Sequence, residues 1–291
     1  MDLQLRHLRA LVAVVDTGTF TDAAGELGVS QAAVSRSVAA LEEALGVRVL
    51  QRTTRHVTLT GTGTQVLASA RRILDEVTHL RRLADRQHSE LRVGYAWAAL
   101  GKHTRRLQRA WAARHPGTSL VFTHTNTPSA GLSDGTADVA VVRSALDDPR
   151  FDTALIGTEA RCAAVATDNA LARRRTLRLS DLVRYPVAID VRTGTTTLGL
   201  WHPGPAPATI RTTHSVDEWL TLIAAGQAVG ITSEATANQN PRPGVAYRML
   251  RQAPRIDVWL AWWRDDPPAR LEDLVSLSRA AYLASGTIDE P

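Results

Sequence analysis

Polar and small side chains suited to contacting nucleic acid gather in one short segment near the start of the chain. They are Gln31, Ala32, Ser35 and Arg36, which are spaced to share the exposed face of a helix, and Ser30 directly before that helix. An amide and a guanidinium can each form two hydrogen bonds to a base edge in the DNA major groove. The carboxylates of Glu42 and Glu43 come only near the far end of the segment. This order favours a helix that enters the groove with its N-terminal end first.

A basic hairpin is predicted directly after this helix. Its two strands are VRVLQR and HVTLT, and Arg48 and His56 frame it. The candidate DNA contacts at its end and tip are Arg52, Thr53, Thr54 and Arg55. Guanidinium and hydroxyl groups placed there can bind the sugar-phosphate backbone, which positions a protein on duplex DNA without reading its sequence.

Three short amphipathic helices are predicted to position these groups. The first runs from Leu5 and closes at Gly18, the second ends at Gly28, and the third follows an N-cap at Ser30 and ends at Gly46. Apolar residues recur on one side of the first and third helices at steps of three and four: Leu5, Leu8, Val12, Val15, Val34, Val38, Leu41 and Leu45. Three helices followed by a basic hairpin form the layout of a winged helix-turn-helix.

A specific family pattern runs through these helices and the hairpin. It comprises AVVDTGTFTDAAGELGVSQAAVSRSVAALEEALGVRVLQRT and the LTGTG that follows, and it resembles the DNA-binding domain of LysR-type transcriptional regulators. The close resemblance covers about residues 1–65 and departs at Ala32, where family members often carry proline or a small polar residue. It implies a sequence-specific transcriptional regulator whose partner is double-stranded operator DNA.

A long helix is predicted from Gly63 to Gln87, where the chain has no proline and no internal glycine. Apolar residues repeat along it at alternating steps of four and three, a period of 3.5: Val66, Ala70, Ile73, Val77, Leu80 and Ala84. This spacing is typical of a face covered by a partner helix. By resemblance, LysR-type regulators pair subunits through this helix, which implies a homo-dimer or tetramer. The alternative is a helix packed on its own chain.

Composition agrees with a two-part globular protein of 291 residues, 44% of them hydrophobic. The net charge of +5 says little about the partner, because residues 1–90 hold eleven Arg against ten Asp and Glu. All seven Trp lie beyond residue 90, so the first part lacks the stacking platforms of single-strand binders. Without a signal-peptide pattern or an 18-residue apolar run, we expect a cytoplasmic location and no membrane partner. The single cysteine, Cys162, excludes an internal disulfide.

Beyond residue 89, short apolar runs alternate with helical stretches, which predicts α/β layers with largely parallel sheets. Predicted helices cover residues 102–114, 217–225 and 269–284. The predicted strands begin at Leu91, Ser119, Ala137, Arg161, Pro186, Ala228 and Ile256.

The resemblance implies that these elements form two subdomains like those of a periplasmic binding protein. The chain would cross between them near Glu159–Cys162 and return near Trp263–Asp265. The predicted fold class is therefore α/β: an N-terminal winged helix-turn-helix, a long linker helix and a two-subdomain effector domain. The domain bounds are 1–60 for DNA binding, 61–88 for the linker and dimerisation helix and 89–291 for effector binding, with subdomain I at about 89–160 and 265–291 and subdomain II at about 161–264.

Side chains at the predicted strand ends are candidates for contact with a small-molecule effector between the subdomains. They are Tyr95, Trp97, Thr125, Asn126, Thr127, Arg143, Arg192, Thr193, Thr195, Thr196, Ser215, Asp217 and Thr232. Many family members place Ser or Thr directly after the first regulatory strand, whereas this chain has AWAALGKH. Arg143 and Arg192 could pair with an acidic group, so an aromatic or aliphatic acid is one candidate effector.

The sequence gives little support for catalysis. The nine histidines include no HExxH, no GxSxG is present, and the GTGTQ at Gly61 lacks the ending of a phosphate-binding loop. We therefore expect no enzyme activity, no metal and no cofactor. Two alternatives remain open: a winged-helix regulator whose C-terminal part binds a protein partner, or an α/β solute-binding or enzymatic domain with a vestigial helical arm.

Overall fold

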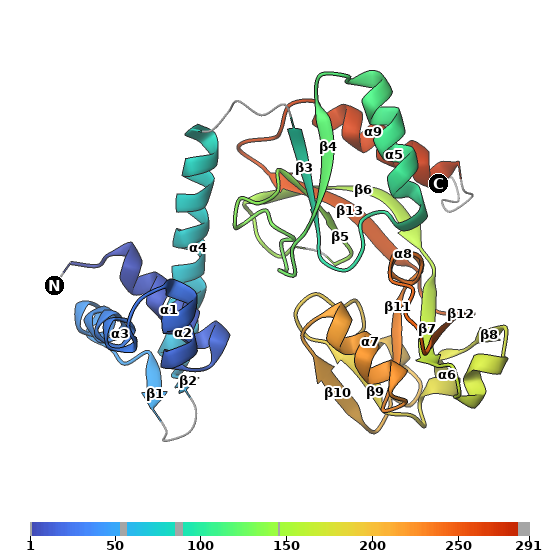
Figure 1. Cartoon of the computed structure of the whole chain (residues 1–291), viewed down its shortest axis with the longest axis horizontal. Coiled ribbons are helices and arrows are strands. Elements are labelled where there is room, and N and C mark those ends of the chain that lie inside the picture. Colours follow the sequence, from blue (N-terminus) through green and yellow to red (C-terminus); the bar gives the residue numbers. More distant parts are fainter. Residues whose placement is uncertain (1, 53–56, 85–89, 145, 285–291) are drawn as a thin grey trace. The chain divides into compact units, whose positions relative to one another are not determined.

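The computed structural model describes residues 2–52, 57–84, 90–144 and 146–284. The chain divides into two compact units, residues 1–86 and 87–291, and each is described by itself. Figure 1 shows the helical first unit and the mixed α/β second unit. Within the described ranges, no helix has the length and apolar character needed to cross a membrane.

The first unit contains the predicted three helices and hairpin. Its elements are α1 (Leu5–Thr17), α2 (Phe20–Leu27), α3 (Gln31–Leu45), β1 (Leu50–Arg52), β2 (Val57–Leu59) and α4 (Gly61–Ala84). Ser30 caps α3, because its hydroxyl accepts a hydrogen bond from the Ala33 N–H at 3.2 Å. The first three helices end at Gly18, Gly28 and Gly46, each in the left-handed conformation that glycine adopts without strain. The winged helix-turn-helix is confirmed.

The core of this unit departs from the predicted stripes at their ends. Leu8, Val34, Val38 and Leu41 are buried as expected. Leu5 and Leu45 are not core residues, with exposed fractions of 37% and 41%. Leu5 is the first residue of α1 and Leu45 is the last residue of α3, and at these ends the helices are less covered by the rest of the domain than at their centres.

The first half of α4 packs on its own domain. Leu67 and Ala70 are buried in the core formed with α1 and α3, and Val66 packs against that core. In contrast, Ile73 is 41% and Leu80 is 66% exposed. The predicted apolar face is therefore divided: its first two members contact this chain, and its exposed members lie further along the helix.

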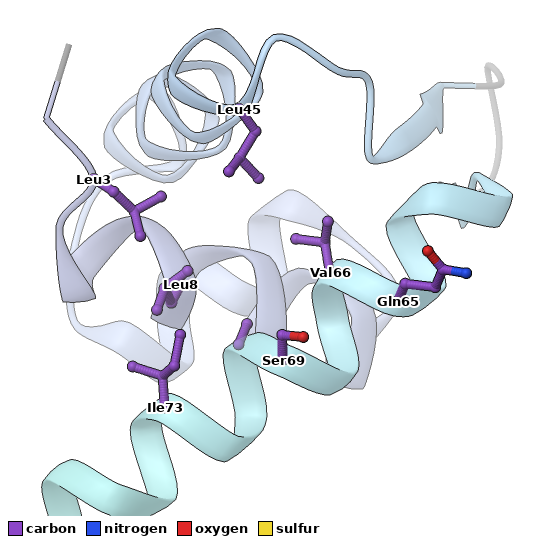
Figure 2. A pocket seen from close by; sticks show the side chains of 8 residues that line it. Leu3, Leu8, Leu45, Gln65, Val66, Ser69 and Ile73 are labelled. Atoms are coloured by element: carbon purple, nitrogen blue, oxygen red, sulfur yellow. The ribbon is translucent and has the colours of Figure 1, made fainter.

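An open apolar groove of about 220 Å³ lies along the first half of α4 and reaches Ile73. It is lined by Leu3, Leu8, Leu45, Gln65, Val66, Ser69, Ala70 and Ile73. Figure 2 shows Ile73 and Val66 of α4 facing the groove together with Leu45 from the end of α3. The exposed Leu45 thus belongs to a surface shared by three segments of the first unit.

The second unit contains two sheets. In the first sheet the strand order is β4 (Ser119–His124), β3 (Glu90–Tyr95), β5 (Val139–Val142), β13 (Ile256–Trp263) and β6 (Phe151–Glu159). The helices α5 (Thr104–Arg114) and α9 (Leu271–Leu283) lie side by side, as Figure 1 shows, and a short 3-10 helix spans Gly101–His103. The core of this subdomain includes Leu107, Trp111, Val139, Leu260 and Tyr282.

The second sheet belongs to the other subdomain. Its strand order is β10 (Ile210–Thr213), β9 (Val187–Asp190), β11 (Val229–Ser233), β7 (Arg161–Ala166), β12 (Val245–Leu250) and β8 (Thr176–Leu177). Its helices are α6 (Leu179–Leu182), α7 (Val216–Ala224) and α8 (Glu234–Gln239), with 3-10 helices at Ala170–Arg173 and Leu198–Trp201. The strands β6, β8, β10 and β12 were missed by sequence reasoning, because exposed edges and half-buried faces remove the apolar run or strict alternation that marks a strand.

Both sheets are mixed, so the prediction of largely parallel sheets holds only in part: among the described strands of the two sheets, five pairs are parallel and four are antiparallel. The strands β3, β4 and β5 are parallel, as are β9, β10 and β11. Two of the strands beside the crossings are antiparallel to both of their neighbours: β13 to β5 and β6, and β7 to β11 and β12. Long apolar strands alone do not reveal their direction.

The chain crosses between the sheets at two places, which can be followed in Figure 1. The first crossing is at Ala160, between β6 and β7. The return lies between Leu250 and Ile256, so its predicted position near Trp263–Asp265 is wrong. The cause is β13, which pairs with β6 from Ile256 to Trp263 and therefore already belongs to the first sheet.

Gly63 permits a close backbone contact at the start of α4. A Cβ at this position would lie 2.0 Å from the carbonyl oxygen of Val49. We expect Gly63→Ala to lower the free energy of unfolding by about 1–3 kcal/mol, the usual cost of overpacking. Urea denaturation followed by circular dichroism measures this. Gly61→Ala in the same helix turn is the control, because its Cβ would meet nothing within 4 Å. Equal stability of the two variants would contradict the packing argument.

Candidate functional site

The N-terminal half of α3 presents the predicted base-reading groups. Gln31, Ala32 and Arg36 are exposed, and Ser35 is half-buried. The opposite side of the helix holds Val34, Val38 and Leu41 in the core. Ser30 uses its hydroxyl as the helix cap. The structure therefore leaves an amide and a guanidinium accessible on one helix face, while the opposite face is packed in the core.

Glu42 is a positioning residue that sequence reasoning missed. Its side chain is 7% exposed, and its carboxylate accepts hydrogen bonds from the N–H groups of Val49 at 2.9 Å and Leu50 at 3.2 Å. Arg48 also donates to it at 3.0 Å. These bonds tie the end of α3 to β1 and withdraw one negative charge from the outer face of the helix. A single Glu in a helical pattern carries no signal that it turns inward.

Of the predicted hairpin contacts, Arg52 ends β1. The side chain of Arg52 and the whole of Thr53, Thr54 and Arg55 lie outside what the structure describes. Their roles in phosphate contact stay predictions.

In the second unit, three predicted effector residues from different subdomains meet directly. The indole Nε1 of Trp97 donates to the Thr193 hydroxyl at 2.9 Å, and that hydroxyl donates to Asn126 Oδ1 at 2.9 Å. The Asn126 amide in turn donates to the carbonyl oxygen of His214 at 2.6 Å. We call these contacts of Trp97, Asn126, Thr193 and His214 the junction.

Trp97 also makes an apolar contact between the two subdomains. It follows β3 of the first sheet but packs in a cluster built mainly by the second subdomain, edge-on to Trp219 with ring centroids 5.2 Å apart. Trp219 is fixed by donating to the carbonyl oxygen of Ala188 at 3.0 Å. The Asn240 amide donates to the Trp97 carbonyl oxygen at 3.2 Å. Trp97 is consequently 9% exposed and couples the two subdomains.

Arg143 lies in a buried ion pair. Its guanidinium donates to both carboxylate oxygens of Glu159, at 3.0 and 2.9 Å, and to the carbonyl oxygens of Ala98 and Ala99, both at 2.6 Å. The hydroxyl of Tyr282 donates to the same carboxylate at 2.7 Å. Burial alone would raise the pKa of Glu159, but the guanidinium of Arg143 outweighs it and holds that pKa below its ordinary value. This environment gives Arg143 a structural role, and its contact with an effector stays a prediction.

The other predicted effector residues are spread around the strand ends. Tyr95 lies edge-on to His124, and Thr125 is 3.4 Å from the Thr136 hydroxyl. The remaining placements are as follows: Thr127 half-buried, Arg192 exposed, Thr195 with its carbonyl bonded to Arg161, Thr196 with its hydroxyl bonded to the Ile231 carbonyl, Ser215 as the cap of α7, Asp217 paired with Arg242 and Thr232 buried. The junction therefore collects only part of the predicted set.

Cys162 has no features of a reactive thiol. It is 4% exposed, and its sulfur lies 3.4 Å from the Met249 sulfur. Burial, reinforced by the charges of Glu234 and Glu159, raises the pKa of the thiol to about 12. The thiolate needed for redox sensing is therefore scarce at neutral pH. Among the described residues, no cluster of three or more His, Cys, Asp or Glu could hold a metal ion.

A winged helix with an accessible polar helix face, joined to a two-subdomain α/β unit, defines a two-part DNA-binding regulator. Two family models match the chain: "Bacterial regulatory helix-turn-helix protein, lysR family" over residues 5–64 and "LysR substrate binding domain" over residues 84–282. The chain belongs to the LysR-type transcriptional regulators, as the resemblance implied. It is a DNA-binding transcriptional regulator with an effector-binding C-terminal domain, not an enzyme.

Similar proteins cover nearly the whole chain. The transcriptional regulator YnfL of Escherichia coli (strain K12) is 33% identical over 280 residues, which span 90% of this chain and 93% of YnfL. The crystal structure of full-length CbnR in complex with its target DNA aligns with a TM-score of 0.56 at 27% identity, covering 96% of this chain and 99% of CbnR. Full-length BenM aligns with a TM-score of 0.56 at 24% identity and 99% coverage of both chains, which supports the fold.

The ion pair at Glu159 predicts a specific pH dependence. A carboxyl whose pKa is lower in the folded state stabilises the protein at neutral pH, and that stabilisation is lost as pH falls below the ordinary value of 4.5. We expect Glu159→Gln to lower the free energy of unfolding at pH 7 by about 3–5 kcal/mol, because it leaves Arg143 buried without its partner. The variant should also lose less stability than the wild type between about pH 5 and about pH 3.

Chemical denaturation at several pH values tests this expectation. Glu90→Gln is the control, because Glu90 is exposed at the start of β3. Parallel stability profiles for wild type and Glu159→Gln would show that the Glu159 carboxylate contributes nothing specific to acid sensitivity.

Proposed function

We propose that α3 reads operator DNA through Gln31 and Arg36, with the hairpin residues 52–55 contacting phosphates. The observation that carries this proposal is the polarity of α3: its accessible donors lie in the N-terminal half, while the Glu42 carboxylate is turned into the core. CbnR, which has the same fold, has been solved with its target DNA. A symmetric assembly would recognise a partly palindromic site with half-sites about 10 base pairs apart. Because the target is chromosomal DNA, we expect the protein to act in the cytoplasm.

Arg36→Ala tests the recognition helix. If Arg36 contacts a base edge, its removal should weaken operator binding by about 1–3 kcal/mol and reduce discrimination against random duplex DNA. Fluorescence anisotropy measures both affinities, with an operator selected by the wild-type protein from a random duplex pool. Arg9→Ala, at an exposed position on α1, is the matched control. Unchanged affinity and discrimination in Arg36→Ala would place the base-reading surface elsewhere.

We also propose that the protein forms a homo-dimer or tetramer in which α4 supplies a contact surface. The support is the exposure of Ile73 and Leu80 and the apolar groove that Ile73 lines together with Leu3 and Leu45. Exposed apolar surface of this kind gains stability when a second apolar surface covers it. Ala70 also lines this groove but is only 1% exposed, so Ile73 and Leu80 supply the exposed apolar side chains of the helix.

Replacing both Ile73 and Leu80 by Asp should reduce the molecular mass in solution. Carboxylates forced into an apolar contact oppose association, because a buried unpaired charge is strongly unfavourable. Light scattering coupled to size exclusion measures the mass. Ala68→Asp adds one carboxylate at another exposed position of α4 and should leave the mass unchanged. An unchanged mass in the double variant would remove α4 from the subunit contact.

The effector is proposed to bind at the junction, where side chains of both subdomains already meet. A ligand there could alter the relation between the subdomains, since Trp97, Asn126 and Thr193 bond to one another across it. Effector control requires different ligand affinities for two arrangements of the domain, because a ligand that binds both equally shifts nothing.

A further inference from the structure

Two side-chain oxygens at neighbouring strand ends of the second subdomain are buried without a hydrogen-bond partner. They are Oδ2 of Asp190, at the end of β9, and Oγ1 of Thr213, at the end of β10. Asp190 is 4% and Thr213 is 1% exposed. The two residues are register partners in a parallel strand pair, so their side chains lie on the same face of the sheet. Since buried polar atoms are nearly always paired, this pair requires an explanation.

The Asp190 carboxylate lies directly behind the junction. Its other oxygen, Oδ1, accepts from the N–H groups of Arg192 at 3.0 Å, Thr193 at 2.8 Å and Gly194 at 3.2 Å, which fixes the turn that carries Thr193. The Thr193 hydroxyl is 3.4 Å from Oδ1 and is also the group that Trp97 and Asn126 contact. The unpaired Oδ2 therefore belongs to the carboxylate that holds Thr193, and Thr193 is the residue that contacts the first subdomain.

We propose that the effector presents a cationic hydrogen-bond donor, an ammonium or amidinium group, to Asp190 Oδ2 and Thr213 Oγ1. To reach them it replaces the direct contact of Thr193 with Trp97 and Asn126. A carboxylate oxygen can only accept hydrogen bonds, and a charged donor gives it the strongest partner. This inference rests on the proposed function, the control of an operator-binding protein by a ligand at the junction.

The surrounding charges agree with a cation and disfavour an acid. Arg143, a candidate partner for an acidic effector, already donates hydrogen bonds to Glu159 and to two carbonyl oxygens, and its side chain is 7% exposed. Arg192, in the same turn as Thr193, is exposed, whereas the Asp190 carboxylate is buried. The buried charged group without a partner for one of its atoms is thus the Asp190 carboxylate.

The test uses the full-length protein and small molecules that share one carbon skeleton: benzylamine, benzamidine, benzyl alcohol and benzoate. Titration calorimetry measures their affinities. We expect the amine and the amidine to bind at least about tenfold more tightly than the alcohol and the carboxylate. Asp190→Asn keeps an oxygen acceptor for the turn but removes the charge, so it should abolish this preference.

Thr213→Val separates ligand recognition from a structural role. It removes an unpaired hydroxyl while keeping the side-chain shape, so the melting temperature should stay equal or rise while amine affinity falls. Thr212→Val, at the adjacent exposed position of β10, is the matched control, and Asp168→Asn is the control for Asp190→Asn. Both controls should leave the preference for amines unchanged.

Three results would overturn the inference. The first two are a preference for benzoate and no binding of either cation. The third is a lower melting temperature in Thr213→Val with unchanged amine affinity, which would mean that a structural water bonds to Asp190 and Thr213. Operator affinity, measured in the same samples, separates this failure from that of the proposed function. A regulator whose operator binding responds to benzoate keeps its proposed function and loses only the cationic effector.

Discussion

The buried ion pair between Arg143 and Glu159 connects the elements on which the effector domain depends. Glu159 ends β6, one residue before the chain crosses to the second sheet, and Arg143 follows β5. Tyr282 of α9 and the carbonyl oxygens of Ala98 and Ala99 complete the network. Because a buried charge without its partner is strongly destabilising, these segments must stay in place together. The pair thereby fixes the residues directly after Trp97 and so the position of the junction.

A comparable constraint orders the DNA-binding unit. The Glu42 carboxylate bonds to the N–H groups of Val49 and Leu50, which positions β1 relative to α3. Gly63 then lets the first turn of α4 approach the carbonyl oxygen of Val49. Through these two contacts at one short segment, the recognition helix, the hairpin and the linker helix form a single packed body. A change in the direction of α4 would therefore be transmitted to the surface that faces DNA.

The sequence predicted those parts of the fold that local rules determine. The helices up to Gly46 follow from apolar spacing, caps and terminal glycines, all within a few residues. The role of α4 was predicted only in part, because a spacing of 3.5 does not distinguish Ala70, packed on its own domain, from Leu80, which is exposed. The predicted direction of β13 and the predicted return crossing were wrong because β13 is positioned by its pairing with β6, about a hundred residues away. Trp97 and Thr193 were each identified at a strand end, but their mutual hydrogen bond depends on the tertiary fold.

The environment of Cys162 has a practical consequence for measuring motion. The sulfur contacts Met249, and burial raises the pKa of the thiol to about 12, so maleimide reagents find little thiolate there. The chain has one cysteine in total. A cysteine introduced at an exposed position of each subdomain would therefore be labelled selectively by a fluorophore, with the native residue left in place. Energy transfer between two such dyes would report the separation of the subdomains in the otherwise unaltered protein.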